Sequence, residues 1–451
     1  MPDFASIFKA YDVRGTVPDQ FDAAMSRSIG AAFARFALDT DADTSRILVA
    51  RDMRESGVEM VAAFTDGATS QGVDVVDLGL ASTDLLYFAS GKLEAPGAMF
   101  TASHNPAQYN GIKFCLAGAR AVGQDTGLAR VRDMAAGGLP AADRTGSRTS
   151  ADMLQDFATH VRSFVDPAVF RPLKVVADTA NGMGGLVVPA VFAELPFDLE
   201  ILFPELDGNF PNHPADPIQV ENQADLRRRV LETGADVGLA FDGDADRVFV
   251  VDETGEPVSG STTTAMVAAG VLAKQPGARI LYNLICSKAV PEIVRERGGE
   301  PIRTKVGHSF IKSIMAETGA AFGGEHSAHY YFRDNYRADS GLIAAMHVLE
   351  ALSIASEPLS ELRKPFDRYA MSGEINTKVP DPLATVEHVA AAYPDADIDR
   401  LDGLTVDLGS WWFNVRASNT EPLLRLNLEA PTRAECDEHT AEVLSLITGK
   451  G

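Results

Sequence analysis

Short apolar runs alternate with amphipathic segments along most of this chain, and this alternation restricts the fold more than any other feature. Residues 46–50 (RILVA) are typical of a buried strand, and the amphipathic stretches 20–38 and 55–71 are typical of helices. The pattern starts again at LKVVADT (173–179) and at ARILYNL (278–284). Alternation of this kind favours mainly parallel sheets covered by helices, so we expect three similar α/β units.

The last part of the chain departs from this alternation. Residues 369–379 are strand-like, 404–428 hold two predicted strands around a loop, and helices are predicted at 382–393 and 432–448. These elements indicate a small α+β domain. A length of 451 residues suits three or four domains. With polar breaks near 150, 255 and 367, the predicted domains are 1–150, 151–254, 255–367 and 368–451.

The charge balance excludes some classes of partner. The chain has 40 Lys and Arg against 63 Asp and Glu, a formal net charge of −23. Such a surface repels nucleic acid and anionic membranes on average, so we expect neither as a partner. It also repels phosphorylated ligands, and a phosphate site would therefore need a local group of Lys or Arg.

The cysteines and the N-terminal segment indicate a cytoplasmic protein. The three cysteines, Cys115, Cys286 and Cys436, are odd in number and far apart, which argues against a disulfide framework or a structural zinc site. The N-terminal sequence MPDFASIFKAYDVRG lacks the apolar core of a signal peptide. The sequence contains no run of about 18 apolar residues, so we expect no transmembrane helix.

The first candidate site is FTASHNPAQYNGIKF, residues 100–114. Ser103 follows a predicted strand, and ligands of α/β sheets bind beyond the carboxyl ends of the strands. A single serine in a loop is usually only a turn residue. Here, however, His104, Asn105 and Pro106 follow it, and Lys113 begins the next strand, so a basic group faces a structured loop.

The second candidate is AFDGDADRVFV, residues 240–250. Asp242, Asp244 and Asp246 alternate with small residues, so three carboxylates can converge, and hard oxygen ligands suit Mg²⁺. One alternative is a hairpin turn with solvated acids; another is an EF-hand, whose remaining ligand positions are apolar here. The spacing favours a metal because three adjacent carboxylates repel one another without a cation. Arg247 follows directly and could reach a phosphate on the metal.

The third candidate is FGGEHSAHYYF, residues 322–332. Glu325 and Ser327 alternate, so both can face one side, and carboxylate and hydroxyl groups suit sugar hydroxyls. Alone, this signal is weak. We interpret His326 and His329 as structural residues.

The fourth candidate is RASNTEPLLRL, residues 416–425, in a predicted loop between strands. Its guanidinium, hydroxyl and amide groups can form a phosphate cradle, and the alternative is a plain polar turn. The cradle residues are Arg416, Ser418, Asn419 and Thr420. Two further basic segments, KAYDVRG and TKVGHS, would by charge alone be ordinary surface.

Together, the four segments resemble the α-D-phosphohexomutase superfamily, most closely the bacterial phosphomannomutase/phosphoglucomutase branch. The resemblance extends from YDVRG (11–15) to RASNTEP (416–422), with the motifs TASHNP, DGDADR and GEHSAH between them. It implies an α/β fold class: three similar α/β domains with mixed sheets and a smaller C-terminal α+β domain, around a central cleft. Each domain would contribute one loop to that cleft.

The resemblance also implies residue roles. Ser103 would carry the phosphoryl group and complete a Mg²⁺ site with Asp242, Asp244 and Asp246. Arg247 would lie beside the transfer, with Lys113 as the proton-transfer partner and His308 as the alternative. Substrate would contact the residues Tyr11, Arg14, Lys305, Glu325, Ser327, Arg416, Ser418, Asn419 and Thr420.

The implied activity is a phosphomannomutase, which interconverts mannose 6-phosphate and mannose 1-phosphate through a phosphoserine and a 1,6-bisphosphate intermediate. Glucose or mannose 1,6-bisphosphate would be the activator. Phosphoglucomutase and phosphoglucosamine mutase activities remain alternatives, and so do a phosphatase and a non-catalytic sugar-phosphate-binding protein.

One residue departs from the branch. Ala328 stands where Gly is usual in the GEHSAH segment. A methyl group is tolerated there if φ is negative and strained if φ is positive.

Overall fold

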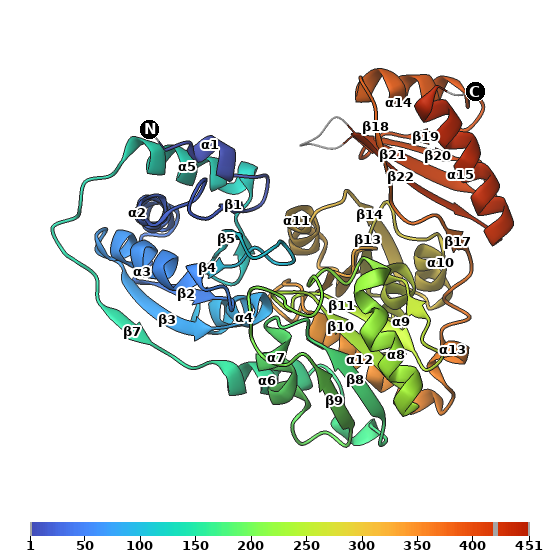
Figure 1. Ribbon diagram of the computed structural model, residues 1–451, viewed down its shortest axis with the longest axis horizontal. Coiled ribbons are helices and arrows are strands. Elements are labelled where there is room, and N and C mark those ends of the chain that lie inside the picture. Colours follow the sequence, from blue (N-terminus) through green and yellow to red (C-terminus); the bar gives the residue numbers. More distant parts are fainter. Residues whose placement is uncertain (1, 418–422, 450–451) are drawn as a thin grey trace.

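The computed structural model describes residues 2–417 and 423–449, apart from the side chains of residues 308 and 309. These residues form four sheets in succession, and each sheet belongs to a separate stretch of sequence. In Figure 1 the N-terminal sheet lies at one end of the molecule, and the C-terminal sheet with its two helices lies at the other.

The first sheet is mixed and has the order β1-β5-β4-β2-β3-β7, with β6 paired to β5. The central strands β2, β3 and β4 are parallel, and β5 runs antiparallel to β1 and β4. The strands are β1 Val13–Thr16, β2 Arg46–Arg51, β3 Asp74–Leu80, β4 Gly97–Phe100, β5 Tyr109–Leu116, β6 Arg120–Ala121 and β7 Arg148–Ser150. The helices are α1 Phe4–Ile7, α2 Ala23–Thr40, α3 Ser56–Thr69, α4 Thr83–Leu93 and α5 Leu128–Gly137.

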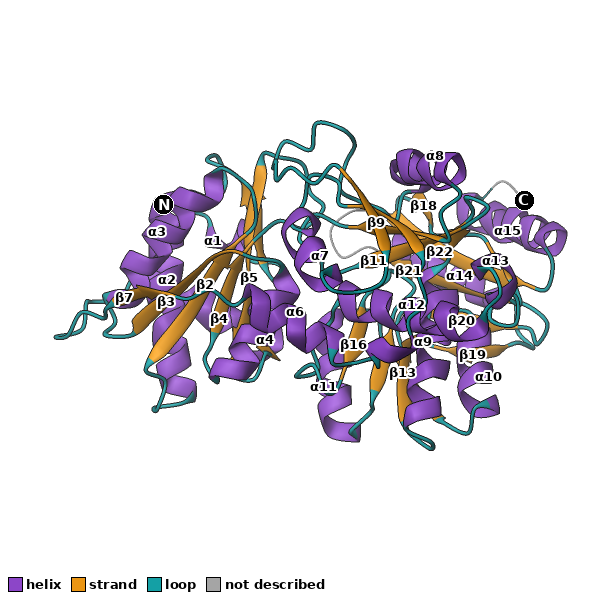
Figure 2. Cartoon of the chain, turned by 90° about the horizontal axis from the view of Figure 1, so that it is seen from below, coloured by secondary structure: helices purple, strands orange, loops and turns teal. Residues whose placement is uncertain are grey.

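Helices cover both faces of this sheet (Figure 2). Alternate residues of β2 enter two different cores: Ile47 and Val49 pack with α2 and α3, whereas Leu48 and Ala50 pack with α4. The predicted buried strand at 46–50 and the flanking helices are therefore present. A strand buried on both faces reads as a continuous apolar run, which is why RILVA carries no polar alternation.

The second and third sheets are also mixed. The second has the order β12-β11-β10-β8-β9 and the third β14-β13-β15-β16. The second contains β8 Lys174–Asp178, β9 Asp198–Leu202, β10 Val237–Phe241, β11 Val248–Asp252 and β12 Pro257–Val258, with α6 Leu154–Arg162, α7 Gly184–Phe192 and α8 Ala224–Thr233. The third contains β13 Arg279–Asn283, β14 Glu300–Thr304, β15 Phe322–Gly324 and β16 Tyr330–Phe332, with α9 Gly260–Lys274, α10 Ala289–Glu296, α11 His308–Thr318, α12 Gly341–Ala355 and α13 Leu359–Leu362.

The fourth sheet is antiparallel and has the order β17-β22-β21-β20-β19, with β18 paired to β22. Its strands are β17 Ala370–Met371, β18 Ile375–Lys378, β19 Asp397–Asp399, β20 Leu404–Asp407, β21 Trp412–Ala417 and β22 Leu423–Ala430, and its helices are α14 Pro382–Ala391 and α15 Arg433–Thr448. The segment 404–428 thus holds three strands where the sequence predicted two, because the short turn at 408–411 separates β20 from β21.

The cores show how the parts are coupled. One apolar cluster runs from the α4 face of the first sheet through the second and third sheets, from Leu86 to Leu239 and Leu342. The C-terminal sheet has a separate core around Phe413 and Leu426. The predicted class, three α/β parts and a smaller α+β part, is confirmed.

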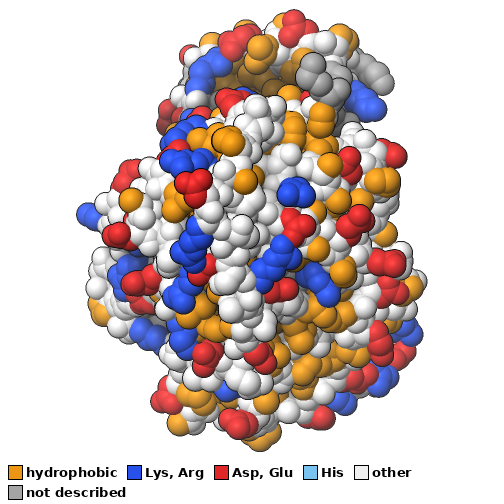
Figure 3. Space-filling view, turned by 90° about the vertical axis from the view of Figure 1, so that its left-hand side faces the viewer, with side chains coloured by type: hydrophobic (Ala, Val, Ile, Leu, Met, Phe, Trp, Pro, Cys, Tyr) orange, Lys and Arg blue, Asp and Glu red, His pale blue; other side chains and the backbone are white. Residues whose placement is uncertain are grey.

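On the face in Figure 3, Lys and Arg side chains lie among Asp and Glu rather than in one large patch. In the described part of the chain, no helix combines the length and apolar character that a membrane span needs.

Candidate active site

The aspartate loop, residues 242–247, joins β10 to β11 as the turn of an antiparallel hairpin. Asp242, Asp244 and Asp246 are each at most 2% exposed, so the alternative of a solvated turn is wrong. One carboxylate oxygen from each lies within 4.8 Å of the other two. The small spacer Ala245 takes the left-handed conformation, with φ of 59°. The loop therefore turns its three carboxylates onto one point.

The serine loop, residues 101–108, joins β4 to β5 and meets the aspartate loop from the first sheet. Ser103 is 5% exposed, and its Oγ donates to Asp242 Oδ2 at 2.9 Å. Its φ of 49° is unusual for a residue with a side chain, and its backbone N–H donates to Thr101 Oγ1 at 2.8 Å. Residues 139 positions apart in sequence are thus in direct contact.

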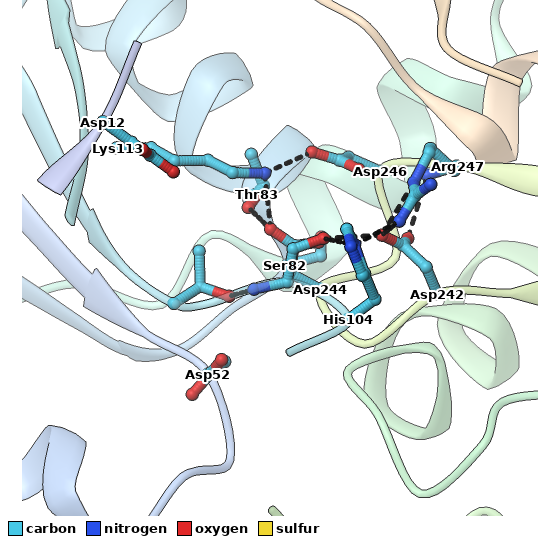
Figure 4. A network of polar contacts seen from close by, with 12 residues as sticks. Asp12, Asp52, Ser82, Thr83, His104, Lys113, Asp242, Asp244, Asp246 and Arg247 are labelled. Atoms are coloured by element: carbon cyan, nitrogen blue, oxygen red, sulfur yellow. Dashed lines mark hydrogen bonds and ion pairs between the residues drawn. The ribbon is translucent and has the colours of Figure 1, made fainter. Parts of the chain in front are cut away.

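Two cations flank the aspartates (Figure 4). Lys113 on β5 donates to Asp244 and to Asp246, at 2.7 Å each. Burial by itself lowers the pKa of Lys113, but the two carboxylates raise it well above its usual value, so the amine is protonated. Arg247 donates through Nε to Asp242 Oδ2 at 3.0 Å and through its backbone N–H to Oδ1 at 3.1 Å.

The aspartates retain unused oxygens. Asp244 Oδ1 and Asp246 Oδ1 are buried, and neither has a hydrogen-bond partner among the described residues. Buried polar atoms are nearly always paired, and unpaired carboxylate oxygens are the ligands that a hard divalent cation binds. The residues present therefore fit a metal ion, as the sequence predicted.

His104 completes the contact between the two loops. Its Nδ1 lies 2.7 Å from Arg247 Nη2 and accepts that hydrogen bond. Burial, together with the charges of Arg247 and Arg14, lowers the pKa of His104 to about 2, so the ring is neutral. Arg14 donates to Asn105 of the same loop. The predicted residue Arg14 therefore contacts the serine loop.

Arg54 is a residue of this site that the sequence analysis missed. It is 1% exposed, and its guanidinium donates to the carbonyl oxygens of residues 103, 105 and 106 in the serine loop and of residue 109 at the start of β5. Its Nε donates to the fully buried Asp52 at 3.1 Å. The available signal was the segment RDMRES (51–56) at the end of β2, since charged residues at the carboxyl end of a buried parallel strand face the ligand edge of a sheet.

The glutamate loop, residues 325–329, joins β15 to β16 in the third sheet. Glu325 is 2% exposed and accepts from Tyr331 Oη at 2.6 Å and from Asn283 Nδ2 at 2.9 Å. Ser327 Oγ lies 3.2 Å from His329 Nδ1. Glu325 is thus fixed in orientation, whereas Ser327 is partnered by a neighbour in its own loop.

His329 lies closer to the reacting groups than its interpretation as a structural residue implied. A ring nitrogen of His329 and carboxylate oxygens of Asp246 and Asp339 lie within 4.8 Å of one another. The loop turns through Ala328, which is fully buried with φ of 64°. The strained case considered for this alanine is therefore the one that occurs.

The remaining predicted residues come from the edges of the site. Tyr11 packs edge-on against Phe310, with ring centroids 6.3 Å apart, and Lys305 Nζ lies 5.8 Å from the centre of the same ring. Arg416, at the end of β21, lies 3.4 Å from Glu374 and 3.7 Å from Asp402. Ser418, Asn419 and Thr420, and the side chain of His308, lie outside the described residues.

This four-part fold, with its serine and aspartate loops in contact, has the architecture of the phosphohexomutases. Models of phosphoglucomutase/phosphomannomutase α/β/α domains I, II and III match residues 5–135, 155–255 and 259–369, and a model of the C-terminal domain matches 374–446. The chain belongs to the phosphoglucomutase/phosphomannomutase family.

Known relatives match over nearly the whole length. The chain is 39% identical to the phosphohexose mutases of Xanthomonas campestris pv. campestris (strain B100) over 450 residues, covering 98% of this chain and 99% of the relative. It is 36% identical to the phosphomannomutase of Escherichia coli (strain K12) over 453 residues, 98% of each. A crystal structure of a phosphoglucomutase/phosphomannomutase family protein from Burkholderia thailandensis superposes with a TM-score of 0.90 at 32% identity, covering 99% of this chain and 98% of that one.

Proposed function

We propose that this chain is a Mg²⁺-dependent phosphomannomutase that interconverts mannose 6-phosphate and mannose 1-phosphate through a phosphoryl group on Ser103. The observation that carries the proposal is the Ser103–Asp242 contact, because it joins a potential phosphoryl carrier to an acidic metal-binding loop. Relatives named phosphomannomutase at 36–37% identity over the full length support the substrate class. A relative named phosphomannomutase/phosphoglucomutase, 38% identical, supports glucose phosphates as a second pair of substrates.

The three aspartates would hold the metal together with one oxygen of the phosphoryl group on Ser103. When bound, Mg²⁺ supplies positive charge that offsets the phosphoryl charge during transfer. Arg247 is fixed between Asp242 and His104, so its guanidinium is positioned before the substrate arrives. This preorganisation is the contribution that phosphoryl transfer requires of a protein.

In the first transfer, the bond between phosphorus and Ser103 Oγ breaks and a bond to the free sugar hydroxyl forms. The proton of that hydroxyl leaves to a base, and the product is a hexose 1,6-bisphosphate. The bisphosphate turns around, and its other phosphoryl group moves to Ser103 Oγ while the released sugar oxygen gains a proton. Lys113 is protonated in this geometry, so we assign it the proton-donating role. We assign the accepting role to a histidine, either His329, which lies beside Asp246, or His308.

The parts of the substrate that do not react are bound away from the transferred group. Glu325 accepts hydrogen bonds from sugar hydroxyls, with Ser327 and Lys305 beside it, and Tyr11 and Arg14 close the side nearest the first sheet. The phosphate already on the sugar is bound by Arg416 with Ser418, Asn419 and Thr420. A dedicated distal phosphate site favours a mutase over a phosphatase, because hydrolysis does not require a doubly phosphorylated sugar to turn around.

The test is a coupled assay with mannose 1-phosphate and with glucose 1-phosphate, each with and without the corresponding 1,6-bisphosphate activator. The parent and a Ser28→Ala control are expected to turn over with Mg²⁺ and to release no orthophosphate. Ser103→Ala is expected to lose multiple turnover entirely, since it lacks the phosphoryl carrier. Near-parental activity of Ser103→Ala, or stoichiometric release of orthophosphate by the parent, would contradict the proposal.

A further inference from the structure

The N-terminus of α4 reaches the aspartate loop from the first domain. Thr83 is fully buried and is the first residue of α4. Its backbone N–H donates to the carbonyl oxygen of Asp244 at 3.0 Å, and its Oγ1 donates to Asp244 Oδ2 at 2.5 Å. Lys113 donates to the same carboxylate oxygen (Figure 4). Because two donors occupy Oδ2, the orientation of the carboxylate is fixed, and Oδ1, which has no partner among the described residues, is presented to a metal ion.

The N-terminus of α12 reaches the same loop from the third domain. Gly341 is the first residue of α12, and a Cβ added to it would stand 2.6 Å from the carbonyl carbon and 2.8 Å from the carbonyl oxygen of Arg247. Arg247 ends the aspartate loop, and both its backbone N–H and its Nε donate to Asp242. The backbone of α12 therefore packs directly on the backbone of the loop, so a shift of this helix end would displace Arg247.

Asp84 joins the two helix N-termini. Its side chain is fully buried and accepts from the hydroxyl of Ser82, the N-cap of α4, and from the hydroxyl of Ser340, the N-cap of α12, the latter at 2.7 Å. Each serine hydroxyl also accepts a backbone N–H of its own helix at 3.3 Å, from Leu85 and Ile343. One carboxylate from the first domain thus lies between two helix N-termini, where the helix dipoles favour a negative charge.

A carboxyl group at this position destabilises the protein more than an apolar side chain would. Burial raises the pKa of Asp84 to about 7, the hydroxyls of Ser82 and Ser340 act against this rise, and the charges of Asp246 and Asp339 add to it. An apolar residue would fill the same space without this desolvation. Hydrogen bonds, however, have direction, and a satisfied buried network specifies one arrangement of the groups that it joins. The contacts of Asp84 therefore indicate a role in geometry rather than in packing alone.

We propose that Asp84 is a positioning residue of the metal-binding loop. It ties the start of α4 to the start of α12. Through Thr83, the start of α4 fixes the position of Asp244; through Gly341, the start of α12 fixes the position of Arg247. The identity of the ion as Mg²⁺ rests on the proposed function, whereas the contacts that join the three domains do not. Residues that orient metal ligands from outside typically contribute about tenfold to hundredfold to metal affinity.

The test measures Mg²⁺ binding to the full-length protein from the rise of its melting temperature with Mg²⁺ concentration, starting from metal-free buffer. The variants are Asp84→Asn and Ser340→Ala, singly and together. The matched control is Asp252→Asn: Asp252 is also fully buried and accepts from Thr254 Oγ1 at 2.6 Å, but it lies at the opposite end of β11 from the aspartate loop. We expect each single variant to weaken Mg²⁺ binding about tenfold or more, and the control to stay within about twofold of the parent.

The double variant distinguishes one shared contact from two independent losses. If both side chains act through the same contact, the double variant should bind Mg²⁺ within about threefold of the weaker single variant. Loss by the product of the two single effects would overturn the proposed tie. Thr83→Val removes the hydroxyl on Asp244 and is expected to weaken Mg²⁺ binding by a similar factor. Ser340→Ala and Thr83→Val break the connection at its two ends, so the proposal stays testable if Asp84→Asn does not fold.

Kinetics separate positioning from general stability. Asp84→Asn should lower kcat about tenfold or more at limiting Mg²⁺ and recover toward the parent as Mg²⁺ saturates, with KM for the hexose phosphate changed by less than about twofold. Asp252→Asn should lower the melting temperature alone.

Three results decide between this inference and the proposed function. Parental Mg²⁺ binding by Asp84→Asn and Ser340→Ala would refute the role of Asp84 alone, even if both variants were less stable. A parent that binds Mg²⁺ without mutase activity would refute the proposed function, and the binding data would still decide the role of Asp84. A parent whose melting temperature does not respond to Mg²⁺ would overturn both.

Discussion

Gly243 of the aspartate loop packs against the backbone of the serine loop, and adding one methyl group there tests the contact between the two loops. A Cβ on Gly243 would stand 2.4 Å from the carbonyl oxygen of Ser103. That oxygen belongs to backbone and also accepts from Arg54 Nη2 at 2.9 Å, so it cannot move aside by rotation. Carbon–oxygen contacts settle near 3.3 Å or more, so Gly243→Ala must separate the two loops by about 0.9 Å.

The expected loss follows from that displacement. The 2.9 Å contact between Ser103 Oγ and Asp242 would lengthen to well beyond hydrogen-bonding range. A misplacement of about 1 Å costs on the order of 10²-fold in rate, so we expect kcat to fall at least that far. KM should change by less than about threefold, because the distal phosphate and sugar contacts are untouched. Overpacking should also destabilise the protein by about 1–3 kcal/mol.

The control is Gly270→Ala on α9, where an added Cβ has no atom within 4 Å. It should keep parental kcat and gain roughly 0.5–1 kcal/mol in stability, as alanine replaces glycine inside a helix. The two variants are compared in the coupled mutase assay and by thermal unfolding. A kcat for Gly243→Ala within threefold of the Gly270→Ala value would refute the claim that the two loops must meet at this distance.

Three other perturbations have defined outcomes. Arg54→Met should destabilise the protein by about 3–5 kcal/mol in urea titrations, because it leaves the charge of Asp52 buried and unpaired. Adding Asp52→Asn should recover part of this loss. Strictly additive changes in the free energy of unfolding for the two substitutions would contradict the pairing. Lys113→Met should lower the melting temperature in metal-free buffer. Mg²⁺ should raise the melting temperature of this variant more than that of the parent, because the metal no longer competes with the amine for the carboxylates of Asp244 and Asp246. Equal shifts of the melting temperature with Mg²⁺ would argue against that competition. Ala328→Gly should change the free energy of unfolding by less than about 1 kcal/mol, because relief of the left-handed strain is offset by the loss of a buried methyl group and by a more flexible unfolded chain. A loss above about 2 kcal/mol by calorimetry would contradict the claim that Ala328 is strained.

Local patterns in the sequence predicted many of the strands and helices. The apolar run at 46–50 predicted a strand because β2 is buried on both faces and needs no polar alternation. The helices predicted at 20–38 and 55–71 correspond to α2 and α3, whose apolar stripes pack against that sheet. The count of strands in 404–428 was wrong, since a turn as short as 408–411 leaves little signal between two apolar segments.

The sequence by itself determined which functional groups the chain carries. The residue types and their spacing indicate the ligands of three motifs: a serine after a strand, three alternating aspartates, and a polar loop that begins with an arginine. Only the tertiary structure decided which of these groups touch. It placed Ser103 on Asp242, closed Lys113 over two carboxylates, and brought Arg54 and His329 into the site. The physical reason is that these contacts join residues from separate strands and sheets. Their distances follow from how the sheets pack, and no local periodicity in the sequence encodes that packing.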